Sequence, residues 1–331
     1  MATNTFSREN LLTAARMTHN QEIIDVAEVL NETNDIVADA HVEQANDITS
    51  HVVSRRTALP TISWVKVGNG WSATTGLVQQ ARETIGMMKA RYQCPDDVMR
   101  LQPNKEKFRM QQERAYIESM AQEFSNTLIY GGITHTSGTL APVPEEFDGL
   151  AARYASVSSD DPTYVISNGD SSATDDTSIW LVQWGPGKVY LVYPRNSSQV
   201  GIKKEDKGLV YTTGDNSEYL WAHVTEFSWD VGLCIEDGRA VKRIANISST
   251  SGDTYTLDED KVIEARNNFK TSGMVYMYCN EKVFTQLQIL AKDKTNVYWS
   301  ENNPFGKPQL YFLDMPVRRC DAIANNEASL T

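Results

Sequence analysis

The residues that could carry out chemistry are few, and their spacing supports no site. The candidates for metal binding are five histidines and four cysteines: His19, His41, His51, His135, His223, Cys94, Cys234, Cys279 and Cys320. Residues 41–43 match the start of a zinc-deaminase motif, but the chain has no C-x-x-C pair to complete it. We therefore expect no metal site and no cofactor.

Other motif matches lie in the wrong structural context. Residues 63–66 match the S-x-x-K pattern of a serine nucleophile, but they lie in an extended run, whereas that nucleophile needs a helix start. Residues 185–188 (GPGK) make a turn that is too short to cradle a phosphate. The acid pairs at 160–161 and 175–176 could act together, but polar loop sequence surrounds them. We therefore expect a protein that is not an enzyme.

Composition and the pattern of apolar residues argue against three further classes of protein. The 331 residues carry 31 Lys and Arg against 43 Asp and Glu, a formal net charge of −12. This balance argues against a nucleic-acid reader that covers phosphates with a broad basic face. No apolar run approaches the ~18 residues of a transmembrane helix, and residues 1–10 lack the basic start of a secretory signal. The widely separated cysteines favour free thiols in a reducing cytosol.

The charge is unevenly distributed along the chain. Residues 1–50 hold nine acids and two bases, and residues 51–93 hold six bases and one acid. Adjacent blocks of opposite sign can arise by accident in a single domain. They can also belong to segments that dock onto different copies of the same protein. Charge alone leaves both interpretations open.

The acidic block lacks the apolar surface for a core of its own. Residues 20–31 place Ile23, Val26, Ala27 and Leu30 at helical spacing, but this stripe is short and polar residues surround it. The segment is therefore predicted to be an arm that packs against a partner.

The basic block is predicted to be a long two-stranded ribbon. Residues 57–67 alternate between two faces, residues 68–70 (Gly-Asn-Gly) predict a turn, and a second extended run begins at residue 77. An isolated ribbon is marginal in water, so this one needs another surface to lie on. The candidate inter-subunit contact residues are Arg55, Arg56, Trp64, Lys66, Trp71, Arg82, Lys89 and Arg91.

The rest of the chain predicts an α+β fold around one long helix. This helix is expected over 104–130, with Asn104 as its N-cap and Gly131-Gly132 at its end. Its expected apolar stripe consists of Ile117, Met120, Ala121, Phe124 and Leu128.

Strands and shorter helices follow this helix. The apolar runs 179–184 and 189–193 flank a tight turn, which predicts a hairpin in a sheet that is covered on both faces. Strands at 218–235 and 240–247 are expected to join through a second tight turn. The remaining expected elements are helices at 258–268 and 281–291 and strands at 274–278, 310–313 and 317–319.

Several segments carry a resemblance to a known family. They are 176–185 (DTSIWLVQWG), 193–195 (YPR), 227–233 (FSWDVGL), 243–247 (RIANI), 277–280 (MYCN) and 315–322 (MPVRRCDA). Together with the acidic arm, the basic ribbon and the long helix, they resemble the major capsid proteins of short-tailed double-stranded DNA phages. The resemblance covers nearly the whole chain. It rests on strings of packing residues, so it indicates a family and not a catalytic site.

The resemblance implies the Hong Kong 97-type capsid fold and a division of the chain. The expected parts are an N-terminal arm (1–50), an extended loop (51–93), a peripheral domain with its spine helix (94–176), and an axial domain with returning peripheral strands (177–331). In commoner members of this fold, the strand pair that resembles 227–247 follows the region that resembles 277–320. Here it precedes that region, which indicates a permuted strand order.

The resemblance also implies a function and partners. The chain is expected to build the icosahedral shell of a virion from copies of itself in hexamers and pentamers. The further expected partners are a portal, a scaffolding protein, a cement or decoration protein and packaged double-stranded DNA, which it would contact only non-specifically. No membrane is involved, and assembly is expected in the cytoplasm of the bacterial host. The competing class is a tail or decoration protein or a carbohydrate-binding enzyme that uses Trp180 and the acids Asp175 and Asp176.

Overall fold

The chain forms two compact units. The structure, a computed structural model, describes residues 18–19, 22–23, 32, 34–136, 139–142, 145–157, 164–169, 176–197, 200–213, 219–250, 256–293, 297–300 and 309–330. Unit 1 comprises Met1–Glu32, Met87–Phe124 and Ser198–Asp230, and unit 2 comprises Thr33–Gly86, Ser125–Ser197 and Val231–Thr331. These units cut across the four expected segments, whose assignment to arm, loop, peripheral and axial parts stays a prediction. Within the described residues, no helix is long and apolar enough to span a membrane.

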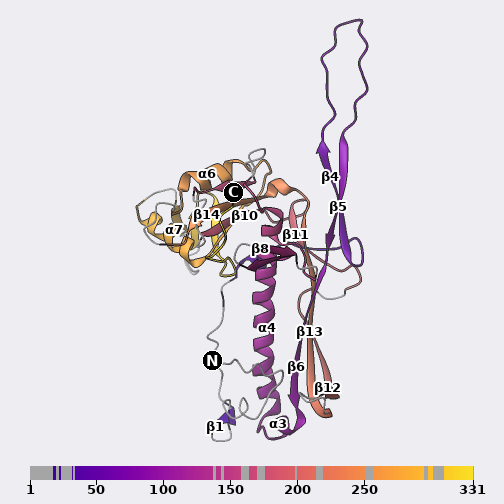
Figure 1. The fold of residues 1–331 in the computed structure, drawn as a ribbon, viewed down its shortest axis with the longest axis vertical. Coiled ribbons are helices and arrows are strands. Elements are labelled where there is room, and N and C mark those ends of the chain that lie inside the picture. The colour runs from indigo at the N-terminus through magenta and orange to yellow at the C-terminus, as the bar shows by residue number, and fades with distance from the viewer. Residues whose placement is uncertain are drawn as a thin grey trace. The chain divides into compact units, whose positions relative to one another are not determined.

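Unit 1 is a ribbon of strands with one long helix (Figure 1). Its elements are β1 (Thr18–His19), β2 (Glu22–Ile23), β6 (Gly86–Pro95), α3 (Asp96–Arg100), the first part of α4 (Lys105–Tyr130), β12 (Lys203–Thr213) and most of β13 (Tyr219–Ile235). Strand β12 pairs with β13 in antiparallel register, and β6 also pairs with β13. The buried core contains Tyr92, Cys94, Val98, Met99, Phe108, Met120 and Phe227.

Helix α4 begins and ends where the sequence predicts. The side chain of Asn104 accepts a hydrogen bond from the backbone N–H of Lys107 at 3.0 Å, so it is the expected N-cap. The helix ends at Tyr130, just before Gly131-Gly132, as predicted. Ile117 was expected on the apolar stripe, but it is 42 % exposed. The buried row runs through residues 108, 120, 124 and 128, with the partly buried Tyr116 beside it, and residue 117 lies about 100° around the helix from Tyr116.

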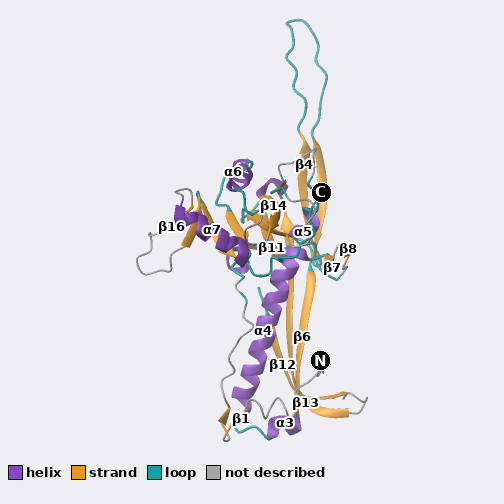
Figure 2. Ribbon diagram, turned by 60° about the vertical axis from the view of Figure 1, so that its left-hand side comes forward, coloured by secondary structure: helices purple, strands orange, loops and turns teal. Residues whose placement is uncertain are grey.

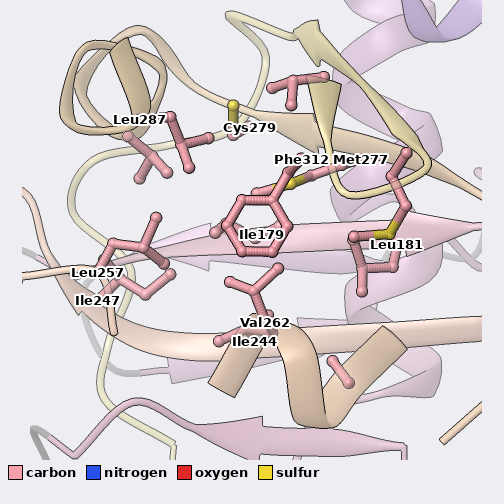
Figure 3. Close-up of a cluster of buried hydrophobic side chains, with 14 of the residues drawn as sticks. Ile179, Leu181, Ile244, Ile247, Leu257, Val262, Met277, Cys279, Leu287 and Phe312 are labelled. Atoms are coloured by element: carbon pink, nitrogen blue, oxygen red, sulfur yellow. The ribbon is translucent and has the colours of Figure 1, made fainter. Parts of the chain in front are cut away.

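A seven-stranded mixed sheet forms the centre of unit 2, in the order β16-β17-β18-β15-β10-β14-β9. Its strands are β9 (Val165–Ser167), β10 (Asp176–Val182), β14 (Val241–Ser248), β15 (Tyr276–Cys279), β16 (Val297–Ser300), β17 (Gln309–Phe312) and β18 (Met315–Arg319). Helices α6 (Glu259–Asn267) and α7 (Glu281–Asp293) supply Val262 and Leu287 to one apolar cluster with Ile179, Met277 and Phe312 (Figure 3). Asp258 caps α6 as predicted, accepting from the N–H of Asp260 at 3.0 Å.

Two predicted hairpins are wrong, although the predicted strands exist. Strand β10 lies in the seven-stranded sheet, whereas β11 (Val189–Tyr193) pairs with the last residues of β13 and with β3 (Val42–Gln44). Likewise β13 and β14 belong to different sheets, and a 3₁₀ turn at Gly238–Ala240 lies between them. In both cases the tight turn carries the chain from one sheet to another. Apolar runs of this kind suit strands that are buried on both faces, and they do not encode which strand pairs with which.

The remaining elements of unit 2 include the basic hairpin. They are α2 (Ile36–Asp39), β4 (Ser50–Ala58), β5 (Leu77–Thr84), β7 (Ile133–Thr136), β8 (Thr139–Pro142) and α5 (Leu150–Arg153). Strands β4 and β5 pair from Ser50↔Thr84 to Ala58↔Leu77. The predicted strand over 57–67 is wrong in its bounds, because residues 59–76 continue beyond this ladder as a loop (Figure 2). The turn is confirmed: the N–H of Asn69 donates to the carbonyl of Lys66 at 3.1 Å, and Gly68 has φ +93°.

Candidate assembly surfaces

The loop at the end of the β4–β5 hairpin exposes large apolar side chains. Trp64 is fully exposed (104 %), and Trp71 is 80 % exposed. Leu59, Ile62 and Val67 on the same loop are also exposed. A soluble monomer rarely concentrates this much apolar surface in one short loop without a binding partner. We call residues 59–76 the hairpin tip, and it fits the inter-subunit role that the sequence predicts for Trp64 and Trp71.

Arg55, another predicted contact residue, is bound inside unit 2. Its Nη2 lies 2.9 Å from Oε1 of Glu83 and also donates to the carbonyl of Ile235. Arg153 from α5 makes a bidentate pair with the same Glu83, at 2.9 and 2.7 Å. The Glu83 side chain is only 8 % exposed, so this three-residue group fixes the root of the hairpin. The sequence did not single out Glu83 or Arg153, because 70 residues separate them.

Close packing of backbone reinforces the root of the hairpin. An added Cβ at Gly232 would lie 2.6 Å from the carbonyl oxygen of Thr84 and 3.1 Å from a methyl group of Val192. Real Cβ atoms do not approach backbone oxygen so closely. The hairpin therefore starts from a rigid base in unit 2.

The other predicted cations divide between the two units. Arg56, Lys66 and Arg82 are exposed on the hairpin, and no ion pair joins them to any residue that the structure describes. Lys89 and Arg91 lie on β6 in unit 1, both exposed. Arg91 pairs with Glu226 at 2.6 Å, and its hydrogen bond lowers the pKa of that carboxyl. The hairpin cations and Lys89 thus remain available for an external partner, whereas Arg91 is paired.

An exposed aromatic cluster on β12 and β13 was missed by the sequence reasoning. The rings of Tyr211 and Tyr219 stack with centroids 5.1 Å apart, and Trp221 lies 5.2 Å from Tyr211. All three side chains are more than half exposed. The cross-strand pairing of Tyr211 with Trp221 creates the cluster. The sequence signal for this strand is the placement of Leu209, Tyr211 and Thr213 at every second position, but the sequence analysis predicts no strand at residues 203–213.

The residues of the competing enzyme hypothesis do not form an open site. Trp180 and Asp176 are buried, at 0 % and 1 % exposure, and Asp176 accepts a hydrogen bond from Ser329 at 2.7 Å. Asp175 lies outside the described residues. Among those residues, no group of three His, Cys, Asp or Glu side chains is placed to hold a metal ion. All four cysteines are buried free thiols, and burial raises the pKa of Cys234 to about 11.

Comparison with known proteins assigns the family and the fold. The family of major capsid protein GP7 matches residues 18–331. A cryo-EM structure of bacteriophage Epsilon15 is similar over 100 % of both chains, with a TM-score of 0.72 and 23 % identity. The capsid of bacteriophage JBD30 has a TM-score of 0.48 and 12 % identity, over 97 % of this chain and 96 % of that one.

The chain is also similar, more weakly, to an encapsulin. The holo-SrpI encapsulin of Synechococcus elongatus PCC 7942 has a TM-score of 0.48 and 12 % identity, over 74 % of this chain and 98 % of that one. No curated protein matches the sequence. The family match covers nearly the whole chain, and the Epsilon15 likeness extends from end to end. The chain belongs to the family of major capsid protein GP7: it is a structural, shell-forming protein of the phage virion, not an enzyme, and it has the Hong Kong 97-type capsid fold.

Proposed function

We propose that the hairpin tip is the main apolar contact by which one copy of this capsid protein holds the next. The observation that carries this proposal is the full exposure of Trp64 on a loop that has no core of its own. Burial of apolar surface stabilises association by about 25 cal/mol per Å², so two covered tryptophans would contribute several kcal/mol to each contact. Repeated over a closed shell, such modest contacts sum to a stable particle.

The copies are arranged as hexamers and pentamers of an icosahedral lattice. A hairpin tip that meets a different surface on its neighbour makes a head-to-tail contact. Such contacts generate a ring when the rotation from one copy to the next closes on itself, as it does in a hexamer or a pentamer. The exposed cations Arg56, Lys66 and Arg82 lie on the hairpin that carries this tip. In a subunit of net charge −12, they would meet acidic surface on most neighbours.

The expected division of labour along the chain belongs to the same proposal. Residues 1–50 act as the arm, 51–93 as the extended loop, 94–176 as the peripheral domain with its spine helix, and 177–331 as the axial domain with returning strands. The order of elements along the chain supports this assignment, since the paired hairpin precedes α4 and the seven-stranded sheet follows it.

Further partners follow from the role of a shell. A portal, a scaffolding protein and a cement or decoration protein would bind the lattice, which would form in the host cytoplasm. The packaged double-stranded DNA would be contacted only non-specifically, because an acidic subunit repels phosphate over most of its surface.

The experiment is a double substitution at the tip. We expect Trp64→Ser with Trp71→Ser to leave the unfolding free energy of the free subunit unchanged within about 0.5 kcal/mol, because both side chains are exposed. The same variant should lose most of its particles in negative-stain microscopy and sedimentation. The matched control is Ile289→Ser, which removes an apolar side chain of 61 % exposure from α7. Particle yield equal to that of the control would contradict the proposal.

A further inference from the structure

His51, at the base of the hairpin, uses both nitrogens of its ring. Its Nδ1 accepts a hydrogen bond from the backbone N–H of Asn46 at 3.3 Å. Its Nε2 lies 3.0 Å from the hydroxyl of Tyr190 on β11, and that hydroxyl donates to Glu236 at 3.2 Å. The imidazole and the Tyr190 ring meet edge to face, with centroids 5.6 Å apart. We call residues 45–49, which connect β3 to β4, the root loop; His51 therefore ties the root loop to β11.

These hydrogen bonds require the neutral form of His51. Because a backbone N–H can only donate, Nδ1 must offer its lone pair, and the single proton of the neutral ring lies on Nε2. That proton points to the oxygen of Tyr190, whose own proton goes to Glu236. Burial raises the pKa of the Tyr190 hydroxyl above its usual 10, and the charge of Glu236 raises it further, so this hydroxyl keeps its proton. Each donor in this chain of hydrogen bonds thus has an acceptor, but only while His51 is neutral.

Charged and titratable groups surround His51, and its Nδ1 binds none of them. Asp47, in the root loop, accepts hydrogen bonds from the N–H of Ile48 at 2.8 Å and from the hydroxyl of Ser50 at 3.1 Å. Glu83, opposite His51 on β5, is held by two arginines. The other groups on the elements around the ring are Tyr190, Cys234 and Glu236 and the cations Arg55, Arg82 and Arg195. A proton added to Nδ1 therefore points at the N–H of Asn46 and not at a carboxylate.

We propose that His51 is a pH-sensitive switch at the base of the hairpin, in which a proton gained at Nδ1 releases the N–H of Asn46 and loosens the root loop. The charged imidazole donates at both nitrogens, so it cannot accept from a backbone N–H. Histidine is the side chain that changes charge between about pH 5 and 8. The switch lies within one subunit and does not depend on the proposed contacts of the hairpin tip.

The released loop stays attached to the hairpin. The side-chain amide of Asn46 donates to the carbonyl of Val52 at 2.7 Å and accepts from its N–H at 2.9 Å, and neither group titrates. Protonation therefore removes one of the bonds that hold the loop and leaves these two. A looser base gives the hairpin more freedom, which binding to any partner must then remove, so association through the hairpin would weaken in mild acid.

Amide exchange and the state of the imidazole in wild-type subunits test the switch. We expect the protection factor of the Asn46 amide, corrected for the intrinsic effect of pH on exchange, to fall at least about fivefold from about pH 8 to about pH 5.5. Two-bond ¹H–¹⁵N spectra of His51 should show its proton on Nε2 alone at the higher pH. Equal protection at both pH values, or a proton on Nδ1 at the higher one, would overturn the proposal.

Two substitutions at this position give the limiting states. His51→Asn places an amide oxygen near the position of Nδ1, so Asn46 keeps an acceptor at every pH. His51→Gln reaches the position of Nε2 instead and leaves Asn46 without that acceptor. We expect the wild type to match His51→Asn at the higher pH and His51→Gln at the lower one. If either variant fails to fold, the imidazole spectrum of the wild type still decides.

A control variant assigns the pH step to this histidine. His41→Asn removes an exposed histidine next to β3 and should keep the wild-type step. Loss of the step in His41→Asn would overturn the assignment to His51. The variant that carries Trp64→Ser and Trp71→Ser should also keep the step, because the switch needs no neighbour. A step that appears only in assembled particles would overturn the switch and place the pH dependence in a contact between copies.

Discussion

A buried and a partly buried arginine in unit 2 are neutralised by acids from distant parts of the chain. Arg243 on β14 lies 2.9 Å from Glu327, and both side chains are 3 % exposed. Arg318 on β18 lies 3.1 Å from Asp39 of α2. Removing one partner of such a pair leaves a charge that neither water nor protein solvates, which is worse than removing both. These pairs therefore fix where segments from both ends of the sequence lie on the central sheet.

Loss of the Glu327 charge should destabilise unit 2 strongly. Besides Arg243, the carboxylate accepts hydrogen bonds from Tyr130 and from Ser178. We expect Glu327→Gln to lower the unfolding free energy of the subunit by about 3 kcal/mol, measured by denaturant titration. The control is Asp97→Asn, which breaks an exposed pair with Arg100 and should cost less than about 1 kcal/mol. Equal effects of the two substitutions would show that the buried pair contributes no more than a surface one.

Asp39 gives unit 2 a pH dependence of unusual sign. Burial raises the pKa of Asp39 above the usual 3.8, and the negative charge of Asp35 raises it slightly further. The positive charge of Arg318 and the hydrogen bond from Tyr278 lower the pKa, but they do not cancel the effect of burial. The folded state thus binds the proton more tightly than the unfolded state. The contribution of Asp39 to stability is full below 3.8 and is lost as pH rises through the folded pKa.

Asp39→Asn isolates this contribution. The difference in unfolding free energy, wild type minus variant, should fall as the pH rises from roughly 3 to 6, since only the wild type loses a proton there. Other titrating groups contribute to both proteins and cancel in the difference. A difference that rises with pH would mean that Arg318 dominates over burial at this carboxyl.

At the scale of elements, the end of α4 is fixed by two glycines in contact. The N–H of Gly149, just before α5, donates to the carbonyl of Gly131 at 2.8 Å. A Cβ on Gly149 would lie 2.6 Å from the nitrogen of Gly131 and 2.7 Å from the carbonyl oxygen of Thr127. Both are backbone atoms, so the strain cannot be relieved by turning a side chain.

Gly149→Ala should therefore lower the unfolding free energy by about 2 kcal/mol, as overpacking does in other interiors. Gly70→Ala on the hairpin tip is the control, because no atom lies within 4 Å of its added Cβ. That change should be neutral or slightly stabilising in the same thermal or denaturant assay. A neutral result at Gly149 would mean that the α4–α5 connection is less tightly packed than its distances indicate.

The sequence predicts elements better than their pairing. Helices α4 and α6 were found with their caps because Asn104 and Asp258 act on the next turn of the same chain. The two hairpins were wrong because apolar strands such as β10 and β11 suit burial in any sheet, and the partner is chosen by tertiary packing.

For the candidate surfaces too, features that depend on neighbouring residues could be predicted from the sequence, and features that depend on distant contacts could not. The exposure of Trp64 was foreseeable from the sequence, because the lack of a core around the ribbon is a local property; its contact role stays a prediction. The binding of Arg55 to Glu83 and Arg153 depends on contacts across the folded unit, so the sequence did not separate this anchored cation from the exposed Arg56.

At the scale of the whole molecule, the proposed hairpin contacts would link folding to assembly. The hairpin tip exposes two tryptophans, and the aromatic cluster at Tyr211, Tyr219 and Trp221 is a second exposed apolar surface. Any partner that binds only the folded subunit stabilises it by mass action, so the particle is more stable than its isolated parts. The net charge of −12 opposes close approach of identical subunits, and on the proposed contacts the exposed hairpin cations would offset that repulsion locally.

Charge reversal on the hairpin tests this electrostatic role. Arg55 is unsuitable, because it anchors the hairpin through Glu83, so the test uses Lys66→Glu with Arg82→Glu. We expect the assembly rate, followed by light scattering at low salt, to fall at least about tenfold, since steering by opposite charges acts mainly on association. The control, Lys270→Glu with Lys282→Glu, changes the net charge equally at exposed positions elsewhere in unit 2.

Salt separates steering from simple repulsion in the same experiment. The Debye length falls from about 10 Å at 0.1 M salt to about 3 Å at 1 M, so the wild type should lose its kinetic advantage over the hairpin variant as salt rises. A general repulsion between acidic subunits would slow both double variants equally and would be relieved in both by salt. Equal rates for the two variants at low salt would therefore place the attraction between subunits in the apolar hairpin tip and not in its charges.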